Sequence, residues 1–307
     1  MKKEDFVLKG KDALELYGSN YKTGGGKGSV VVVHGMAEHR KRYDKFARNL
    51  ANSGYSVYTY DQRGHGETAR ENDLPLGHLE AGNGWENLLE DVRETIRFVE
   101  SREGSTPTFL FGHSMGSFVG RSYVIEYGSK VDGLILSGTG RVNRFILYSL
   151  IPLAKLEKLI RGEKAESVLM EKIMFASHNR DFEPARTELD WLTRDTETVE
   201  SYLEDDLAGF SCTTGFYDEF VLGLRSIAAR EAPERFPRNL RLLLLVGEND
   251  PVGGEREIRK LAERFREFEE LTAQLKVYEG ARHELLHEIN REEVIKDTVD
   301  WLDEAVG

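Results

Sequence analysis

The chain has 307 residues, of which 39% are hydrophobic, and a formal net charge of −12. The length allows one large α/β domain or two small ones, and we expect one domain with an insertion. The negative charge argues against binding to nucleic acid or to anionic lipid, because both select basic surfaces. The single cysteine, Cys212, has no second cysteine with which to form a disulfide or a zinc site. The sequence shows no apolar run long enough for a signal peptide or a transmembrane segment, so we expect a cytoplasmic protein.

The first elements along the chain predict an antiparallel hairpin, formed by Phe6–Leu8 and Leu14–Tyr17 and followed by a glycine turn at 24–26. Short apolar runs then alternate with amphipathic segments, which predicts a mostly parallel sheet flanked by helices. The predicted strands are Val30–Val33, Ser56–Tyr60, Thr108–Phe111, Leu134–Ser137, Leu242–Val246 and Gln274–Tyr278. The predicted helices are Tyr43–Asn52, Trp85–Ser101, Ser117–Tyr127, Glu255–Phe268 and Glu292–Leu302.

The alternation stops between about Gly140 and Pro237, where the sequence favours helices alone. We therefore predict a core of residues 1–139 and 238–307, with residues 140–237 inserted as a helical cap. An apolar stripe in this insertion indicates either ordinary burial of a helix face or a lid whose inner face lines an acyl pocket. Its members are Phe145, Ile146, Leu150, Ile151, Leu153 and Leu156.

The most informative motif follows the strand that ends at Phe111. Gly112-His113-Ser114-Met115-Gly116 fits the G-x-S-x-G frame, which between a buried strand and a helix forms a sharp turn that lifts the serine hydroxyl above a parallel sheet. Glycines are needed on both sides because a side chain would collide with backbone in so tight a turn. Ser114 is thus the candidate nucleophile.

A serine nucleophile needs a histidine base and a carboxylate that orients it, in the chain order Ser, Asp or Glu, His for this kind of turn. Asp250 follows the strand that ends at Val246, and His283 follows the last predicted strand. Glu248 is the nearest competitor for the acid. We predict the triad Ser114, Asp250 and His283.

The oxyanion of the reaction requires two backbone N–H groups. Met115, directly after the candidate nucleophile, supplies one. The loop after the strand Val30–Val33 should supply the other, and we assign it to Met36.

A competing motif overlaps the candidate base. His283-Glu284-Leu285-Leu286-His287 has the H-E-x-x-H spacing of zinc proteases, with Glu304 as a conceivable third ligand. That motif must lie within a helix to place both histidines on one face, yet Gly280 and a predicted strand come just before it. We therefore expect no metal.

Taken together, these motifs resemble the α/β-hydrolase family, in particular its monoacylglycerol lipase and lysophospholipase group, which is also labelled serine aminopeptidase-like. The resemblance covers nearly the whole chain. The segments that carry it are His34–His39 with Arg42-Tyr43, Asp61–Gly66, Gly112–Gly116, Gly247–Val252 and the loop with His283.

The resemblance implies an α/β-hydrolase fold and a cofactor-free serine esterase acting on a small monoacyl ester such as a monoacylglycerol or lysophospholipid. It also implies that Glu38 and Arg42 lie near the polar head of the substrate, and that Asp61–Gly66 is mainly structural. No role follows for Trp191–Asp195, which resembles a cap segment of bacterial relatives. Acyl transferase, haloperoxidase, peptidase or non-catalytic binding functions stay open, whereas dehalogenases and epoxide hydrolases use aspartate where Ser114 stands.

Overall fold

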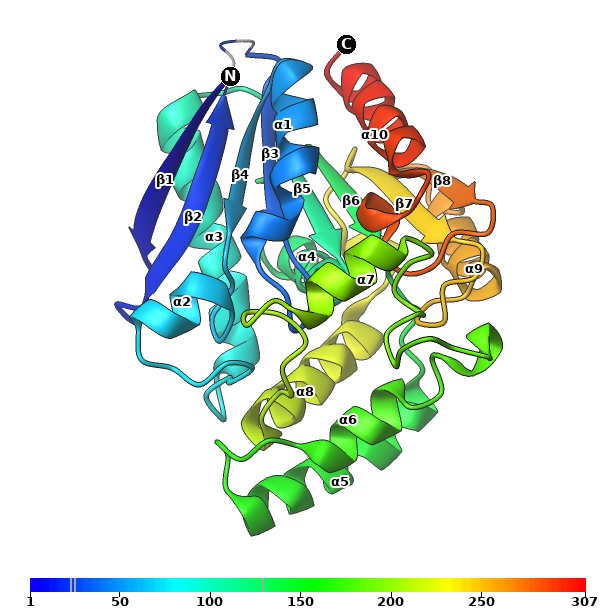
Figure 1. Ribbon diagram of the computed structural model, residues 1–307. Helices are drawn as coiled ribbons and strands as arrows, with labels where there is room; N and C mark the ends of the chain where they lie inside the picture. The colour runs from blue at the N-terminus through cyan, green and yellow to red at the C-terminus, as the bar shows by residue number, and fades with distance from the viewer. Residues whose placement is uncertain (23, 25, 129) are drawn as a thin grey trace.

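The computed structural model describes residues 1–22, 24, 26–128 and 130–307. At its centre is an eight-stranded sheet with the order β1-β2-β4-β3-β5-β6-β7-β8 (Figure 1). The strands are β1 (Lys2–Lys9), β2 (Glu15–Lys22), β3 (Gly28–Val33), β4 (Tyr55–Tyr60), β5 (Thr108–His113), β6 (Gly133–Ser137), β7 (Arg241–Gly247) and β8 (Thr272–Tyr278).

Strands β1 and β2 pair in antiparallel fashion, and β2 is antiparallel to β4. All further neighbours in the sheet are parallel. The predicted hairpin, the six predicted core strands and the mostly parallel sheet are therefore confirmed. The predicted glycine turn at 24–26 contains Gly25, which lies outside the described residues.

The helices predicted for the core are also present, with bounds that differ by about one turn or less. They are α1 (Asp44–Asn52), α3 (Gly84–Glu103), α4 (Met115–Tyr127), α9 (Glu255–Arg266) and α10 (Arg291–Val306). The short helix α2 (Gly66–Glu71) was not predicted, because six mostly polar residues carry no apolar periodicity.

Alternate residues of the central strands face two apolar clusters. Val31 and Val33 pack in the cluster that contains the buried residues of α3, α4 and α9. Val30 and Val32 pack in the cluster that contains those of α1 and α10. Because the parallel strands are covered on both faces, they appear in the sequence as continuous apolar runs.

The predicted insertion, residues 140–237, lies between β6 and β7 and contains α5 (Arg144–Arg161), α6 (Val168–Phe175), α7 (Thr196–Leu203) and α8 (Thr214–Arg230). Helix α8 packs against α4 and α5. In Figure 1, α5 and α6 lie farthest from the sheet, with α8 between them and the strands. None of the helices in the described part of the chain combines the length and apolar character needed to cross a membrane.

The apolar stripe predicted for α5 does not form a single inner face. Leu150 is buried together with Leu147 and Ala154, and Ile151 is half-buried. The other predicted members, Phe145, Ile146, Leu153 and Leu156, are exposed, and Phe145 retains 87% of its accessible surface. Apolar residues lie on both faces of α5, so their spacing alone could not show which face turns toward the core. For these four residues the prediction of a pocket-lining face is wrong.

One buried arginine on α4 binds both ends of the insertion. The Arg121 guanidinium donates to Gly140 O at 2.7 Å, at the start of the insertion. It also donates two hydrogen bonds of 2.7 Å to the carboxylate of Glu231, which follows α8. The helix that begins after Ser114 is thereby fastened to the entry and the exit of the insertion.

Candidate active site

Ser114 occupies a strained turn between β5 and α4. Its φ is 49° and its ψ is −118°, a conformation that residues with a side chain rarely adopt. A Cβ at Gly112 would lie 2.5 Å from Gly116 O, and one at Gly116 would lie 2.1 Å from Val33 O, so both positions require glycine. Ser114 is partly exposed while its neighbours His113 and Met115 are buried. The turn therefore presents the serine side chain at the carboxyl end of β5.

The predicted acid and base lie in contact. Asp250 is in the loop after β7, and His283 is in the loop after β8. The His283 Nδ1–H group donates to Asp250 Oδ1 at 3.0 Å, and both side chains are buried. The Val252 N–H group also donates to Asp250 Oδ1, at 2.9 Å. With its proton on Nδ1, the neutral imidazole has Nε2 free to accept another proton.

The surroundings of His283 favour its protonated form. Burial alone would lower the pKa of His283, but the charge of Asp250 and the hydrogen bond to it outweigh burial and raise this pKa. For Asp250, burial acts to raise the pKa, yet the charge and hydrogen bond of His283 lower it. The two side chains thus stabilise each other as an ion pair once His283 accepts a proton.

The serine and histidine loops converge through their neighbours. The rings of His113 and His283 are 4.9 Å apart between centroids. A Cβ at Gly138 would lie 2.9 Å from His283 Cε1 and 3.0 Å from His113 Cε1. In the described part of the chain no hydrogen bond joins Ser114 Oγ to His283 Nε2, so this contact of the triad stays a prediction. Such bonds are often long before substrate binds.

The loop predicted to stabilise the oxyanion lies beside the serine. A Cβ at Gly35 would be 3.3 Å from Ser114 Cβ. Met115 is the first residue of α4, so its N–H group has no acceptor within the helix. Among the described residues, no backbone or side-chain atom accepts a hydrogen bond from the N–H group of Met36 or Met115. Met115 therefore follows Ser114 directly, Met36 follows the residue that lies beside it, and neither N–H group has an acceptor among the described residues; their role as an oxyanion hole stays a prediction.

The side chain of His34 links this loop to the loop that starts at Asp61. Its Nδ1–H group donates to Gly35 O at 2.7 Å, and its Nε2 accepts from the Gln62 N–H group at 2.9 Å. Burial lowers the pKa of His34 to about 4, so the ring stays neutral and can make both contacts at neutral pH. The loop that starts at Asp61 thereby supports the backbone beside Ser114.

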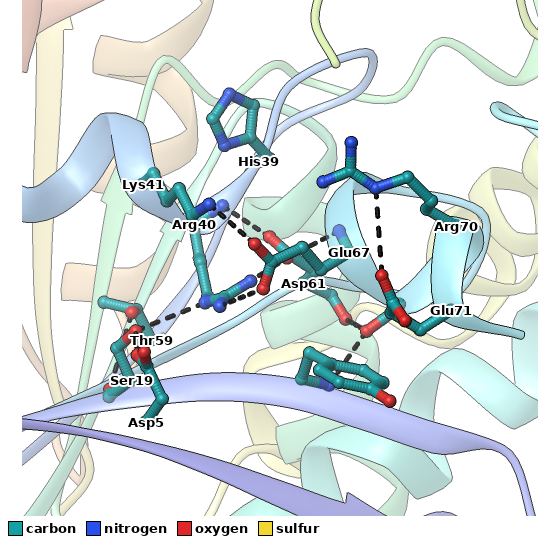
Figure 2. A network of polar contacts seen from close by, with 12 residues as sticks. Asp5, Ser19, His39, Arg40, Lys41, Thr59, Asp61, Glu67, Arg70 and Glu71 are labelled. Carbon is teal, nitrogen blue, oxygen red and sulfur yellow. Dashed lines mark hydrogen bonds and ion pairs between the residues drawn. The ribbon is translucent and has the colours of Figure 1, made fainter.

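A second contact between these loops is ionic, and Figure 2 shows it. Arg40 is buried, and its guanidinium forms an ion pair with Asp61. Its backbone N–H group donates to Asp61 Oδ1 at 2.7 Å. Arg40 also contacts Glu67 at 2.6 Å. These contacts agree with the structural role expected for the segment Asp61–Gly66.

Glu38 and Arg42, predicted to bind the substrate head, are buried in an ion-pair network. Arg42 donates to Glu38 Oε2 at 2.8 Å and makes two hydrogen bonds of 2.7 Å to Glu284. The remaining Glu38 oxygen accepts from the N–H group of Gly35 and, at 2.8 Å, from the Tyr43 hydroxyl. Burial opposes ionisation, but Arg42 lowers the pKa of Glu38 and of Glu284. The network joins the Gly35 loop to the residue after His283, and a direct contact of Glu38 or Arg42 with substrate stays a prediction.

Sequence reasoning missed Glu284 as the partner of Arg42, and its only signal was its place next to His283. It also missed Trp191, whose ring centroid lies 5.1 Å from that of His283. No local pattern connects Trp191 with His283, because they are 92 positions apart.

The overlapping zinc-protease motif does not lie in an α-helix. His283 is in a loop, and Leu285–His287 form a single 3-10 turn. His283 Nδ1 is bound to Asp250, and the His287 Nε2–H group donates to Arg42 O at 3.2 Å. The two imidazoles therefore do not share a helical face in the way that the motif requires.

Comparisons with known proteins agree with this fold. A family model described as serine aminopeptidase, S33 matches residues 25–290. A monoacylglycerol lipase of Mycolicibacterium smegmatis is 27% identical over 281 residues, which are 90% of this chain and 88% of that protein. Phospholipase YtpA of Bacillus subtilis is 24% identical, over 90% of this chain and 95% of its own. A thermostable carboxyl esterase from Bacillus coagulans, solved in complex with glycerol, superposes with a TM-score of 0.90 at 24% identity and full coverage of both chains.

Proposed function

The chain belongs to the serine aminopeptidase-like (S33) family of α/β-hydrolases and is a serine hydrolase, and we propose that it cleaves monoacylglycerols or similar monoacyl esters, such as lysophospholipids. The observation that carries the proposal is the buried hydrogen bond from His283 Nδ1 to Asp250 Oδ1 beside the strained turn of Ser114. The monoacylglycerol lipase and the phospholipase among the relatives support the substrate class.

In this proposal Ser114 Oγ attacks the acyl carbon while His283 Nε2 takes the hydroxyl proton. The carbonyl oxygen, now negatively charged, accepts hydrogen bonds from the N–H groups of Met36 and Met115. The alcohol leaves with the proton from His283, and an acyl group remains on Ser114. A water molecule, deprotonated by His283, then releases the acid and restores the serine.

We assign choice of substrate to the insertion, residues 140–237, as a cap over this site. The support comes from its inner side rather than from the exposed face of α5. Met36 packs against the apolar cluster that also contains Leu147, Leu150 and Met170 of the insertion. We propose that an acyl chain bound to Ser114 lies against buried apolar side chains of the insertion such as these.

The test is a panel of substrates offered to the purified protein and to Ser114→Ala. It contains monoacylglycerols, lysophospholipids, diacylglycerols, aryl esters and aminoacyl p-nitroanilides, and a serine-reactive phosphonate labels the nucleophile. We expect monoacyl esters to give the highest kcat/KM and phosphonate to label only the parent. Faster cleavage of anilides than of esters would favour a peptidase, and labelling of Ser114→Ala would overturn the assignment of the nucleophile.

A further inference from the structure

The segment Trp191–Asp195, here called the brace, belongs to the insertion but packs on the loop that carries His283. The Glu284 N–H group donates to Leu192 O at 2.7 Å. Thr193 Oγ1 donates to His287 O at 3.0 Å, and the Arg194 Nε–H group donates to Glu288 at 2.8 Å. The Arg282 guanidinium donates to Thr193 O at 3.2 Å, so contacts with the brace lie on both sides of the candidate base.

The ring of Trp191 contacts the imidazole of His283. The planes are inclined by 37° at a centroid distance of 5.1 Å, and the two residues expose only 7% and 2% of their surface. Trp191 is itself held in place: its ring stacks on Phe175 at 6.0 Å and meets the edge of His178 at 4.7 Å. Its backbone N–H group donates to Asn179 Oδ1 at 2.8 Å. The indole is therefore a fixed wall against the imidazole.

Such a wall matters because His283 becomes positively charged during each turnover. Two kinds of charged or titratable group surround it. Asp250, Glu284 and Glu38 attract the imidazolium, whereas His113 and His178 oppose it when they are protonated. The π face of an indole is uncharged, favours a neighbouring cation and keeps water away from the Asp250 hydrogen bond.

We propose that Trp191 is a positioning residue for the candidate base: its ring, held by the brace, keeps the His283 imidazole turned so that Nδ1 faces Asp250 and Nε2 faces Ser114. This inference rests on the proposed function, in which His283 is the base. It gives the insertion a part in the chemical step in addition to its proposed part in binding the acyl chain.

The kinetic test compares Trp191→Leu with Trp191→Phe. A loss of orientation at the base should lower kcat about 10- to 100-fold in Trp191→Leu, with KM nearly unchanged. Trp191→Phe keeps an aromatic face and should recover most of kcat. The matched control is Phe182→Leu, because Phe182 packs on the same apolar cluster but lies over Arg282. An unchanged kcat in Trp191→Leu, or an equal loss in the control, would overturn the proposal.

A second measurement needs neither activity nor the leucine variant. Protonated imidazole quenches a neighbouring indole, so the fluorescence difference between the parent and Trp191→Phe should rise with pH as His283 loses its proton. Burial and His283 hold the pKa of His178 at about 4, which keeps its own transition separate. The transition should vanish in His283→Gln. Its persistence in that variant, or its absence from the parent, would contradict the proposed contact.

The activity of His283→Ala, measured beside the kinetic test, separates this inference from the function on which it rests. If His283→Ala retained activity, His283 would not be the base, whatever the fluorescence shows. If His283→Ala is inactive while Trp191→Leu keeps its kcat, only the role of Trp191 is wrong.

Discussion

The central strands and helix α5 are both rich in apolar residues, yet they use them in opposite ways. In β7 the run Leu242–Val246 is completely buried. In α5, Leu159 keeps 82% of its surface exposed, while Leu150 on the other face is buried. The strands are covered on two faces by helices, so every residue of an apolar run there is buried. A helix at the edge of the molecule has an inner and an outer face, and apolar residues on both leave the orientation to tertiary packing.

The largest expected effect is at Ser114, which directly follows the buried strand β5. There we expect substitution to be tolerated least. Ser114→Ala should lower kcat on a monoacyl ester by about 10⁶-fold, because members of such a triad act as a unit. Circular dichroism should show an unchanged fold. Residual activity within tenfold of the parent would end the proposed mechanism. His287→Ala serves as a control, and an equal loss there or on chelation would favour the zinc alternative.

The next effect tests the acid in the loop after β7. Asp250→Asn should lower kcat by about 10⁴-fold, because an amide no longer fixes the proton of His283 on Nδ1.

The same variant tests the pH dependence. In the parent, His283 must be neutral to act as the base and its pKa is raised, so kcat/KM should begin to fall with decreasing pH at a pH above 6.5, the ordinary pKa of histidine. Without the charge of Asp250, burial dominates and the acidic limb should move to lower pH. A limb that does not move would mean that another group titrates.

A third prediction concerns the contacts of Arg121, which join α4 of the core to both ends of the insertion. Arg121→Leu leaves the carboxylate of Glu231 buried without its cation, which should lower the free energy of unfolding by about 3–5 kcal/mol. The matched control is Arg230→Leu, whose pair with Glu126 is exposed and should contribute about 1 kcal/mol or less. Urea unfolding of the three proteins measures both. Equal losses would show that burial of the Arg121 pair has no special weight.

The smallest effect separates the two faces of α5. Each methylene of the acyl chain that enters an apolar pocket should add about 0.8 kcal/mol to binding, so kcat/KM should rise with acyl length until the pocket ends. Leu159→Gln, on the outer face, should leave this dependence unchanged and alter stability by no more than about 0.5 kcal/mol. A changed dependence on acyl length in Leu159→Gln would place the outer face in the substrate path.

Local chemistry explains which features could be predicted from the sequence. The runs of valine and leucine predicted the strands, and the glycines around Ser114 predicted a turn that steric clashes indeed enforce. Asp250 and His283 followed from chain order and from their places after β7 and β8. Each of these features could be recognised from a short stretch of sequence or from the order of such stretches along the chain.

The features that were missed depend on residues far apart in the chain. The pair of Arg42 and Glu284 and the contact of Trp191 with His283 exist only because the folded loops meet. The outward face of α5 was missed for a related reason, since its neighbour α8 begins more than fifty residues after α5 does. Charge and apolar character are visible in a sequence, but their partners across the fold are not.

The contacts of Arg121 with Gly140 and Glu231 limit how the insertion could be exchanged between relatives. A foreign segment would need a carboxylate where Glu231 stands and apolar residues where α8 packs against α4, whereas any residue at position 140 supplies the backbone carbonyl. A graft that replaces only residues between these points would keep both contacts of Arg121, whereas replacing Glu231 by a neutral residue would leave the buried Arg121 cation without its carboxylate. Gly140 and Glu231 are thus the two positions at which such an exchange would have to preserve the contacts of Arg121.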